Sequence, residues 1–186
     1  MKKTKAALPA GVLILLAAGA VFLLSQDKTK PAPKTAGKKY TKPEFIALVT
    51  PYAKAIGAKI GVPYKFIIAQ ICLETNFGNS SLFQKYFNVG GVKAVKGEKF
   101  VLLPTYEYIK GEKVRVPQKF AVYDNLNAGI VGYAKILLNK YFKKYAHKTT
   151  DAKKYAALLQ SGKPKYATDI NYVSKIHKLI DTLPLA

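Results

Sequence analysis

The chain has 186 residues, enough for one ordinary domain and a short appendage, and it carries 31 basic against 10 acidic side chains, a formal net charge of +21. Because Arg115 is the only arginine, and proteins that read DNA sequence rely on arginine for bidentate contacts, this composition argues against specific nucleic-acid recognition. It fits either a generally basic, soluble surface or attraction to a polyanion such as nucleic acid, anionic lipid or an acidic cell-wall polymer.

The N-terminus predicts a membrane anchor. Residues Met1–Lys5 carry three lysines, and Ala6–Leu24 then runs without a charged side chain. A helix of that length covers about 28 Å, close to the thickness of a bilayer's hydrocarbon core. No cleavage site with small residues follows, so an uncleaved anchor is favoured over a secretory signal peptide. Lysines and arginines are usually more frequent on the cytoplasmic side of a membrane span. Here more lysines follow the span than precede it, which disfavours an exported domain, so the membrane topology stays open.

A flexible linker is expected after this span. The segment Ser25–Lys39, "SQDKTKPAPKTAGKK", is polar and contains proline and glycine. Fully extended, such a segment reaches roughly 50 Å, which would hold a domain away from a membrane surface. The folded domain is expected over Tyr40–Ala186.

The domain is expected to begin with a long helix. Thr41 and Glu44 have the spacing of a capping box, with a proline between them in the first helical turn. The helix should end near Gly57 or Gly61, since glycine commonly terminates helices. Its apolar face should carry Phe45, Leu48, Val49, Tyr52, Ala53 and Ile56.

Two further helices and a hairpin follow in the prediction. Pro63 opens a helix that reaches about Thr75, and a short helix ends near Tyr86. The next stretch is rich in Val, Tyr and Phe and contains a Lys-Gly turn. It predicts an antiparallel β-hairpin with strands at Val101–Ile109 and Lys113–Val122.

Three more helices complete the predicted domain. Asp124 is expected to cap the first, Thr150 or Asp151 the second, and Asp169 the third. The second helix should end at Gly162. The sequence therefore predicts an α+β domain, mostly helical with a small β insert.

The sequence gives little indication of a metal site, a cofactor site or a nucleophilic cysteine. Cys72 lies in an apolar run without a second cysteine, so it is interpreted as a small hydrophobe rather than a nucleophile. His147 and His177 have no second ligand at the spacing of a zinc site, and no glycine-rich phosphate loop is present. We expect no metal and no cofactor.

Two of the ten acidic residues, Glu74 and Glu107, have no plain structural assignment. Glu74 continues the helical face of Ile67, Gln70 and Ile71, where loss of hydration should raise its pKa. A carboxyl that keeps its proton near neutral pH can protonate a leaving oxygen, as the acid does in glycoside hydrolysis. The alternative is a glutamate that points to water, although the helix dipole disfavours a carboxylate at a helix C-terminus.

The stretches "LETNFGNSSL" and "YFNVGGVKA" resemble the signature of the glucosaminidases of glycoside hydrolase family 73, which includes flagellar peptidoglycan hydrolase domains and many bacterial autolysins. "PTYEY", "FAVYDNLNAGI" and "YATDINY" resemble later parts of the family pattern, and the motifs follow the family's order over about Thr41–Leu183. Three positions depart from the pattern: Phe77 stands where Trp is commoner, Gly90 replaces a usual aromatic, and Ile170 replaces a usual proline.

The resemblance implies a lysozyme-like fold with a cleft between a helical lobe and a small β-lobe. It implies that Glu74 is the general acid toward the bond between N-acetylglucosamine and N-acetylmuramic acid in peptidoglycan. Glu107 is the best match for a second carboxylate that activates water or stabilises positive charge. Alternatively Glu107 is one polar residue on a strand, and the substrate's own N-acetyl group assists.

Four residues are candidates for substrate binding by the same resemblance. Tyr166 would orient the sugar or its acetamido group, and Phe77 would offer a face for stacking. Tyr172 and Asn88 complete the set. The alternatives are core packing for Phe77 and Tyr172, and a turn-holding role for Asn88.

Three other functions remain open at the level of sequence. A lytic transglycosylase or muramidase could use the same fold, a non-catalytic membrane-tethered adaptor could hold glycan, and a basic membrane protein could bind nucleic acid. The expected partners are peptidoglycan and, through the N-terminal helix, a membrane. The expected location is a single-pass membrane protein with its domain facing the cell wall, or a virion membrane if the chain comes from a phage.

Overall fold

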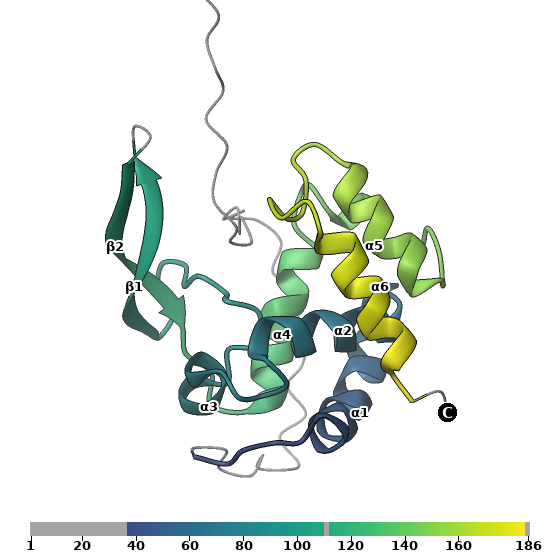
Figure 1. The fold of residues 1–186 in the computed structure, drawn as a ribbon, viewed down its shortest axis with the longest axis horizontal. Helices are drawn as coiled ribbons and strands as arrows, with labels where there is room; N and C mark the ends of the chain where they lie inside the picture. Colours follow the sequence, from purple (N-terminus) through teal and green to yellow (C-terminus); the bar gives the residue numbers. More distant parts are fainter. Residues whose placement is uncertain (1–36, 110–111, 185–186) are drawn as a thin grey trace, which may run out of the picture.

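The computed structural model describes residues 37–109 and 112–184, with the backbone alone for 106–109 and 113. Six α-helices, one 3₁₀ helix and two strands are described in this part of the chain. Their bounds are α1 Lys42–Ile60, α2 Tyr64–Thr75, α3 Ser81–Tyr86, β1 Phe100–Ile109, β2 Glu112–Ala121, α4 Leu126–Leu137, η1 Lys143–Tyr145, α5 Ala152–Ser161 and α6 Tyr172–Thr182. Figure 1 shows a helical body from which the hairpin projects on one side.

The predicted start and end of α1 are confirmed. Thr41 accepts the Glu44 backbone N–H, and the Glu44 side chain accepts the backbone N–H of Thr41, which completes the capping box. The helix ends at Gly61, whose φ of 67° lies in the left-handed region that glycine adopts without strain.

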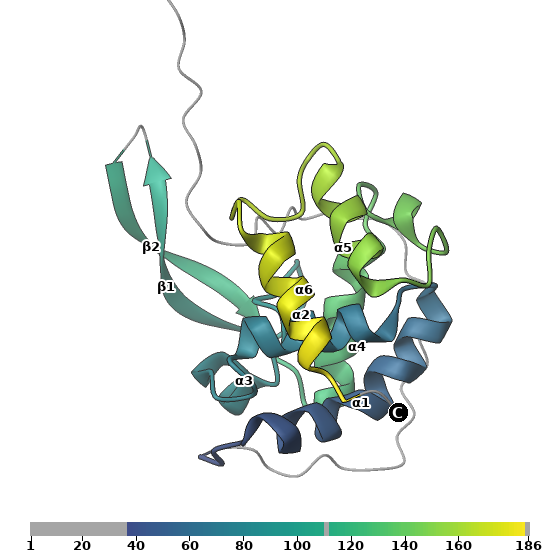
Figure 2. The same cartoon turned by 45° about the vertical axis from the view of Figure 1, so that its right-hand side comes forward.

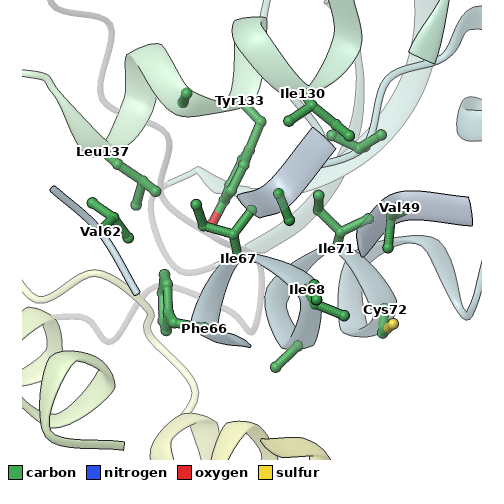
Figure 3. Packing of buried hydrophobic residues seen from close by; sticks show 14 of the residues in the cluster. Val49, Val62, Phe66, Ile67, Ile68, Ile71, Cys72, Ile130, Tyr133 and Leu137 are labelled. Atoms are coloured by element: carbon green, nitrogen blue, oxygen red, sulfur yellow. The ribbon is translucent and has the colours of Figure 1, made fainter. Parts of the chain in front are cut away.

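The core is built around α2. Its residues 66–72 are all buried, and α1, α5 and α6 pack against it. Figure 3 shows Ile67 and Ile71 of α2 in one cluster with Ile130 and Tyr133 of α4. Because a helix that is apolar on every side must be enclosed, and each buried isoleucine stabilises the fold by about 2 kcal/mol, this run fixes α2 in the centre. Its C-terminal end emerges at the edge of the core.

The hairpin agrees with its prediction within one residue at each strand end. The strands are antiparallel, from the pair Phe100–Ala121 to the pair Ile109–Glu112. A two-stranded hairpin is marginally stable by itself, so its base must be held by the body. Phe120 and Ala121 are buried there, and the backbone N–H of Ala121 donates to the carbonyl of Val92 at 2.9 Å. Figure 2 shows the far end of the hairpin standing away from the helices.

Two predicted helix caps are wrong. Asn125, not Asp124, caps α4, since its side chain accepts the backbone N–H of Ala128 at 2.9 Å. Asp124 instead forms an exposed ion pair. Helix α6 begins at Tyr172, three residues after Asp169, whose carboxylate accepts the backbone N–H of Asn171 at 2.9 Å and the ammonium of Lys175 at 2.6 Å. In both cases the pattern places a capping side chain near the start but cannot decide between neighbouring positions, which depend on the entering backbone.

The predicted anchor Ala6–Leu24 and most of the predicted linker lie outside the described residues. Within 37–109 and 112–184, no helix has both the length and the apolar character that a bilayer span requires. The described residues therefore allow a comparison with the prediction only for the domain expected from Tyr40 onward.

Candidate active site

Glu74 lies in the last turn of α2, where the central helix leaves the core. Its side chain is partly buried, and burial raises the pKa of its carboxyl from the ordinary 4.5 to about 7. The cause is lost hydration, which disfavours the charged form. The predicted rise is thus found, and a substantial part of the population of this carboxyl is protonated at neutral pH.

A short chain of hydrogen bonds fixes the orientation of this carboxyl. The hydroxyl of Tyr172, at the start of α6, donates to Oε1 of Gln70 at 2.8 Å. Nε2 of the same amide donates to Oε1 of Glu74 at 3.0 Å, one helical turn further along α2. Because Oε1 of Gln70 is occupied as an acceptor, its Nε2 must face Glu74. The second carboxyl oxygen of Glu74 forms no hydrogen bond within the described part of the chain, and it can carry a proton.

Three tyrosines surround this pair. The hydroxyls of Tyr133 from α4 and Tyr166 from the segment before α6 lie 3.3 Å apart, and the rings of Tyr166 and Tyr172 lie 5.5 Å apart. Burial raises the pKa of all three phenols, and the charge of Glu74 raises each further, which places the carboxyl near all three. The phenols therefore stay neutral near pH 7 and act as hydrogen-bonding groups, not as bases.

The predicted site residues Glu74, Tyr166 and Tyr172 are thus brought together from three segments. Tyr166 is 1% exposed and Tyr172 is 2% exposed, so both contribute to the core as well as to the surroundings of the carboxyl. For Tyr172, the packing role that the sequence left open is present in the structure. Any contact of these two residues with a sugar in this conformation would be limited to a small part of each side chain.

Asn88 holds a turn. Its Nδ2 donates to the carbonyls of Val92 and Ala121, both at 2.9 Å, and its Oδ1 accepts the backbone N–H of Val92 at 2.8 Å. Within the turn, Gly90 lies against the ring of Tyr133, where a Cβ atom would come within 2.5 Å of Cδ2. The aromatic residue that the family pattern favours at Gly90 would not fit this approach. Asn88 therefore joins the hairpin base to the turn beside the tyrosines.

We expect Asn88→Ala to destabilise the fold. The variant leaves buried carbonyls without their donor, and each unsatisfied buried group costs about 1 to 3 kcal/mol, so the free energy of unfolding should fall by about 3 kcal/mol. Urea denaturation followed by circular dichroism measures the change. If stability were unchanged and only glycan affinity fell, Asn88 would be a ligand-binding residue instead.

Phe77 and Glu107 are not joined to this cluster by any described contact. Phe77 is half-buried, has a φ of 52°, and lies beneath the ammonium of Lys42, which is 5.1 Å from its ring centre. It lines a cavity between α2 and α6. The backbone of Glu107 lies in β1 opposite Val114, and its side chain is outside the described part.

Sequence reasoning missed two members of the cluster. Gln70 could have been found, because it is the one polar amide in the apolar run of α2 and lies four residues before Glu74. Tyr133 gave no such signal, since an aromatic residue on the apolar face of a helix is usually part of the core. Only the meeting of α4 with the segment before α6 places its hydroxyl beside that of Tyr166.

We expect Tyr172→Phe to lower kcat about fivefold with little change in KM. Without the Tyr172 hydroxyl, Gln70 loses the bond that orients its amide, and a buried hydrogen bond is worth about 1 kcal/mol, which corresponds to roughly a fivefold rate difference. Initial rates of wall-suspension clearing measure the effect. The matched control is Tyr155→Phe, because the Tyr155 hydroxyl is buried without a hydrogen-bond partner among the described residues. Equal losses in both variants would contradict the orienting role.

Comparisons with known proteins identify the family that this chain resembles. Residues 50–185 match the family profile described as Glucosaminidase, mannosyl-glycoprotein endo-beta-N-acetylglucosaminidase. The peptidoglycan hydrolase FlgJ of Salmonella typhimurium is 31% identical over 146 residues, which are 75% of this chain and 46% of that protein. A probable N-acetylmuramidase of Lactococcus lactis is 31% identical over 141 residues, 73% of this chain and 32% of that protein. The chain thus spans less than half the length of these curated relatives.

A solved structure confirms the fold. The catalytic domain of the autolysin Auto from Listeria monocytogenes matches with a TM-score of 0.68 at 27% identity, over 78% of this chain and 88% of that chain. The expected lysozyme-like α+β arrangement, with a helical lobe and a small antiparallel hairpin, is therefore correct. Since the family match covers most of the chain and includes Glu74 and all three clustered tyrosines, the chain belongs to the glucosaminidase family.

Proposed function

We propose that this protein is a peptidoglycan hydrolase that cleaves the glycan strand between N-acetylglucosamine and N-acetylmuramic acid, with Glu74 as the general acid. The observation that supports this most is the partly buried carboxyl at the end of α2, with a pKa of about 7. The names of the relatives support the substrate class, since FlgJ is called a peptidoglycan hydrolase.

In the proposed reaction, Glu74 gives its proton to the glycosidic oxygen as the bond from that oxygen to C1 of N-acetylglucosamine breaks. The departing N-acetylmuramic acid leaves with a hydroxyl, and positive charge develops on the remaining sugar ring. The water that attacks C1 loses a proton either directly to the ionised Glu74 or to Glu107, from which the proton returns to Glu74 through solvent, so the enzyme regains its starting state. Gln70 and Tyr172 keep the carboxyl in one orientation through both transfers.

The bond that is cleaved distinguishes this proposal from its rivals. Digested peptidoglycan is reduced with borohydride and analysed by mass spectrometry, so that each new reducing end is labelled. Reduced N-acetylglucosamine is the expected product. Reduced N-acetylmuramic acid would instead indicate a muramidase, an alternative that the name of the lactococcal relative favours, and anhydro ends would indicate a lytic transglycosylase.

Glu107 is part of the proposal as the second carboxylate. Its position on β1, in the lobe opposite the helical body, suits a group that stabilises charge on the sugar ring or activates water. Glu107→Gln should therefore lower kcat more than tenfold in the same assay, whereas Glu112→Gln in the same hairpin should not. A smaller loss would leave the substrate's N-acetyl group as the assisting nucleophile.

We also propose that the segment Ala6–Leu24 anchors the domain to a membrane, with the domain facing the cell wall. The support is the charge-free apolar run in the sequence. Full-length protein should float with liposomes, and a full-length variant with Leu15→Lys and Leu16→Lys should not. Equal flotation of both would remove the tether from the proposal.

A further inference from the structure

A cavity of about 390 Å³ is lined by residues of α2 and α6, the two helices that carry Glu74 and Tyr172. Its lining includes Lys42, Leu73, Asn76, Phe77, Lys175, Lys178 and Leu179. Leu73 and Asn76 flank Glu74 along α2, and Lys175 lies one turn after Tyr172 on α6. Both views show α6 crossing α2 (Figures 1 and 2), so the cavity and the carboxyl share the same pair of helices.

The cavity combines an apolar floor with a basic rim. Leu73, Phe77 and Leu179 are partly buried and pack against the core. Among the described residues, the lining contains three lysines and no carboxylate. The ammonium of Lys175 bonds to Asp169, just outside the lining, and the ammonium of Lys42 lies over the Phe77 ring, an interaction that is weaker than pairing with a carboxylate. The cavity therefore suits a ligand with both small apolar groups and negative charge.

We infer that this cavity binds the acidic peptide stem that peptidoglycan carries, an inference that rests on the proposed function. The stem is attached to N-acetylmuramic acid, the sugar on the leaving side of the bond that Glu74 would protonate. A peptide of four or five residues spans roughly 13 to 17 Å when extended, which exceeds the diameter of an α-helix with its side chains, about 10 to 12 Å. Alanine methyl groups of the stem match the floor, and its carboxylates match Lys42 and Lys178.

Binding of the stem in this cavity has a consequence for specificity. The enzyme should prefer glycan that still carries peptides over glycan from which an amidase has removed them. The preference should appear mainly in KM, because the contacts are formed equally in the bound substrate and in the transition state. Because the lysines of the rim are exposed, their attraction for the carboxylates of the stem should also weaken as salt is added.

The kinetic test compares two double variants on both substrates. Lys42→Ala with Lys178→Ala should raise KM about fivefold on peptide-bearing peptidoglycan and leave KM on amidase-treated glycan unchanged. Lys59→Ala with Lys154→Ala removes the same charge from exposed positions outside the cavity and serves as the matched control. An equal loss on both substrates, or a loss no larger than that of the control, would overturn the inference.

A binding measurement separates this inference from the proposed function, since it needs no turnover. N-acetyl-L-alanyl-γ-D-glutamate, which represents the part of the stem nearest the glycan, is titrated into full-length protein and followed by amide NMR shifts. Shifts should concentrate at Leu73, Phe77 and Leu179 and disappear in the Lys42→Ala, Lys178→Ala variant. Absence of these shifts in the wild-type protein would overturn the inference even if glycan is cleaved. Their presence without any glycan cleavage would overturn the proposed function alone.

Discussion

Glu74→Gln is expected to lower kcat on peptidoglycan about a hundred- to ten-thousand-fold, the range that a positioned general acid contributes. Glutamine has nearly the same shape and can still accept the bond from Nε2 of Gln70, so the fold and the surrounding hydrogen bonds should be kept. It has no proton of suitable acidity to give to the leaving oxygen. Muropeptide release, followed by chromatography, measures the loss over that range.

The matched control for this substitution is Glu44→Gln. Glu44 is an exposed glutamate in the capping box of α1, and glutamine completes that motif as well. Its activity should remain within a factor of two of the wild-type value, a range typical of neutral surface substitutions. Clearing of peptidoglycan by Glu74→Gln at the rate of Glu44→Gln would remove Glu74 from the mechanism.

The second large effect is expected in the pH dependence of the reaction. Because the acid must hold its proton when the sugar binds, kcat/KM should fall about tenfold per pH unit once the pH exceeds the pKa of Glu74, about 7. From pH 7, where half of the carboxyl is protonated, to pH 9 this amounts to roughly a fiftyfold loss. Rates between pH 5 and 9 at constant ionic strength measure the profile. An alkaline limb that begins near pH 4.5 would show a hydrated carboxylate and contradict the mechanism.

The same pKa has a consequence for stability that does not depend on activity. Between the ordinary value of 4.5 and about 7, folded Glu74 keeps a proton that the unfolded chain has released. The free energy of unfolding therefore falls as the pH rises through this window, by at most about 3 kcal/mol, and less to the extent that water reaches the partly exposed side chain. Glu74→Gln lacks this term, so it should gain stability relative to the wild type between pH 5 and pH 8. Urea titrations at both pH values measure the difference, and the other titrating groups cancel in the comparison.

Gain of stability with loss of activity would identify Glu74 as a residue kept for function. A partly buried carboxyl close to Tyr133, Tyr166 and Tyr172 is unfavourable for folding once it is charged. A purely structural glutamate at this position would show the opposite pattern, because its replacement would lower stability and leave the reaction unaffected.

Most of the helices and the hairpin could be predicted from local patterns. The Thr41–Glu44 capping box and Gly61 mark the ends of α1 because caps satisfy the backbone groups that a helix leaves free, and these groups lie within a few residues of the cap. The sequence predicts the hairpin because β-branched and aromatic residues flank a glycine turn. The caps at Asp124 and Asp169 were misplaced, because adjacent polar residues compete for the position and the incoming chain decides between them.

By itself, the sequence determined the helical domain with its β insert, the apolar run that makes α2 the central helix, and the placement of a carboxylate at the end of that run. These features depend on neighbours along the chain. The tertiary structure alone decided that Gln70 and Tyr172 would orient the carboxyl, that Tyr133 would meet Tyr166, and that Asn88 would brace the hairpin base. Each of these contacts except the one within α2 joins residues 33 or more positions apart. Contacts of that kind arise only when whole helices pack, and no local pattern carries them.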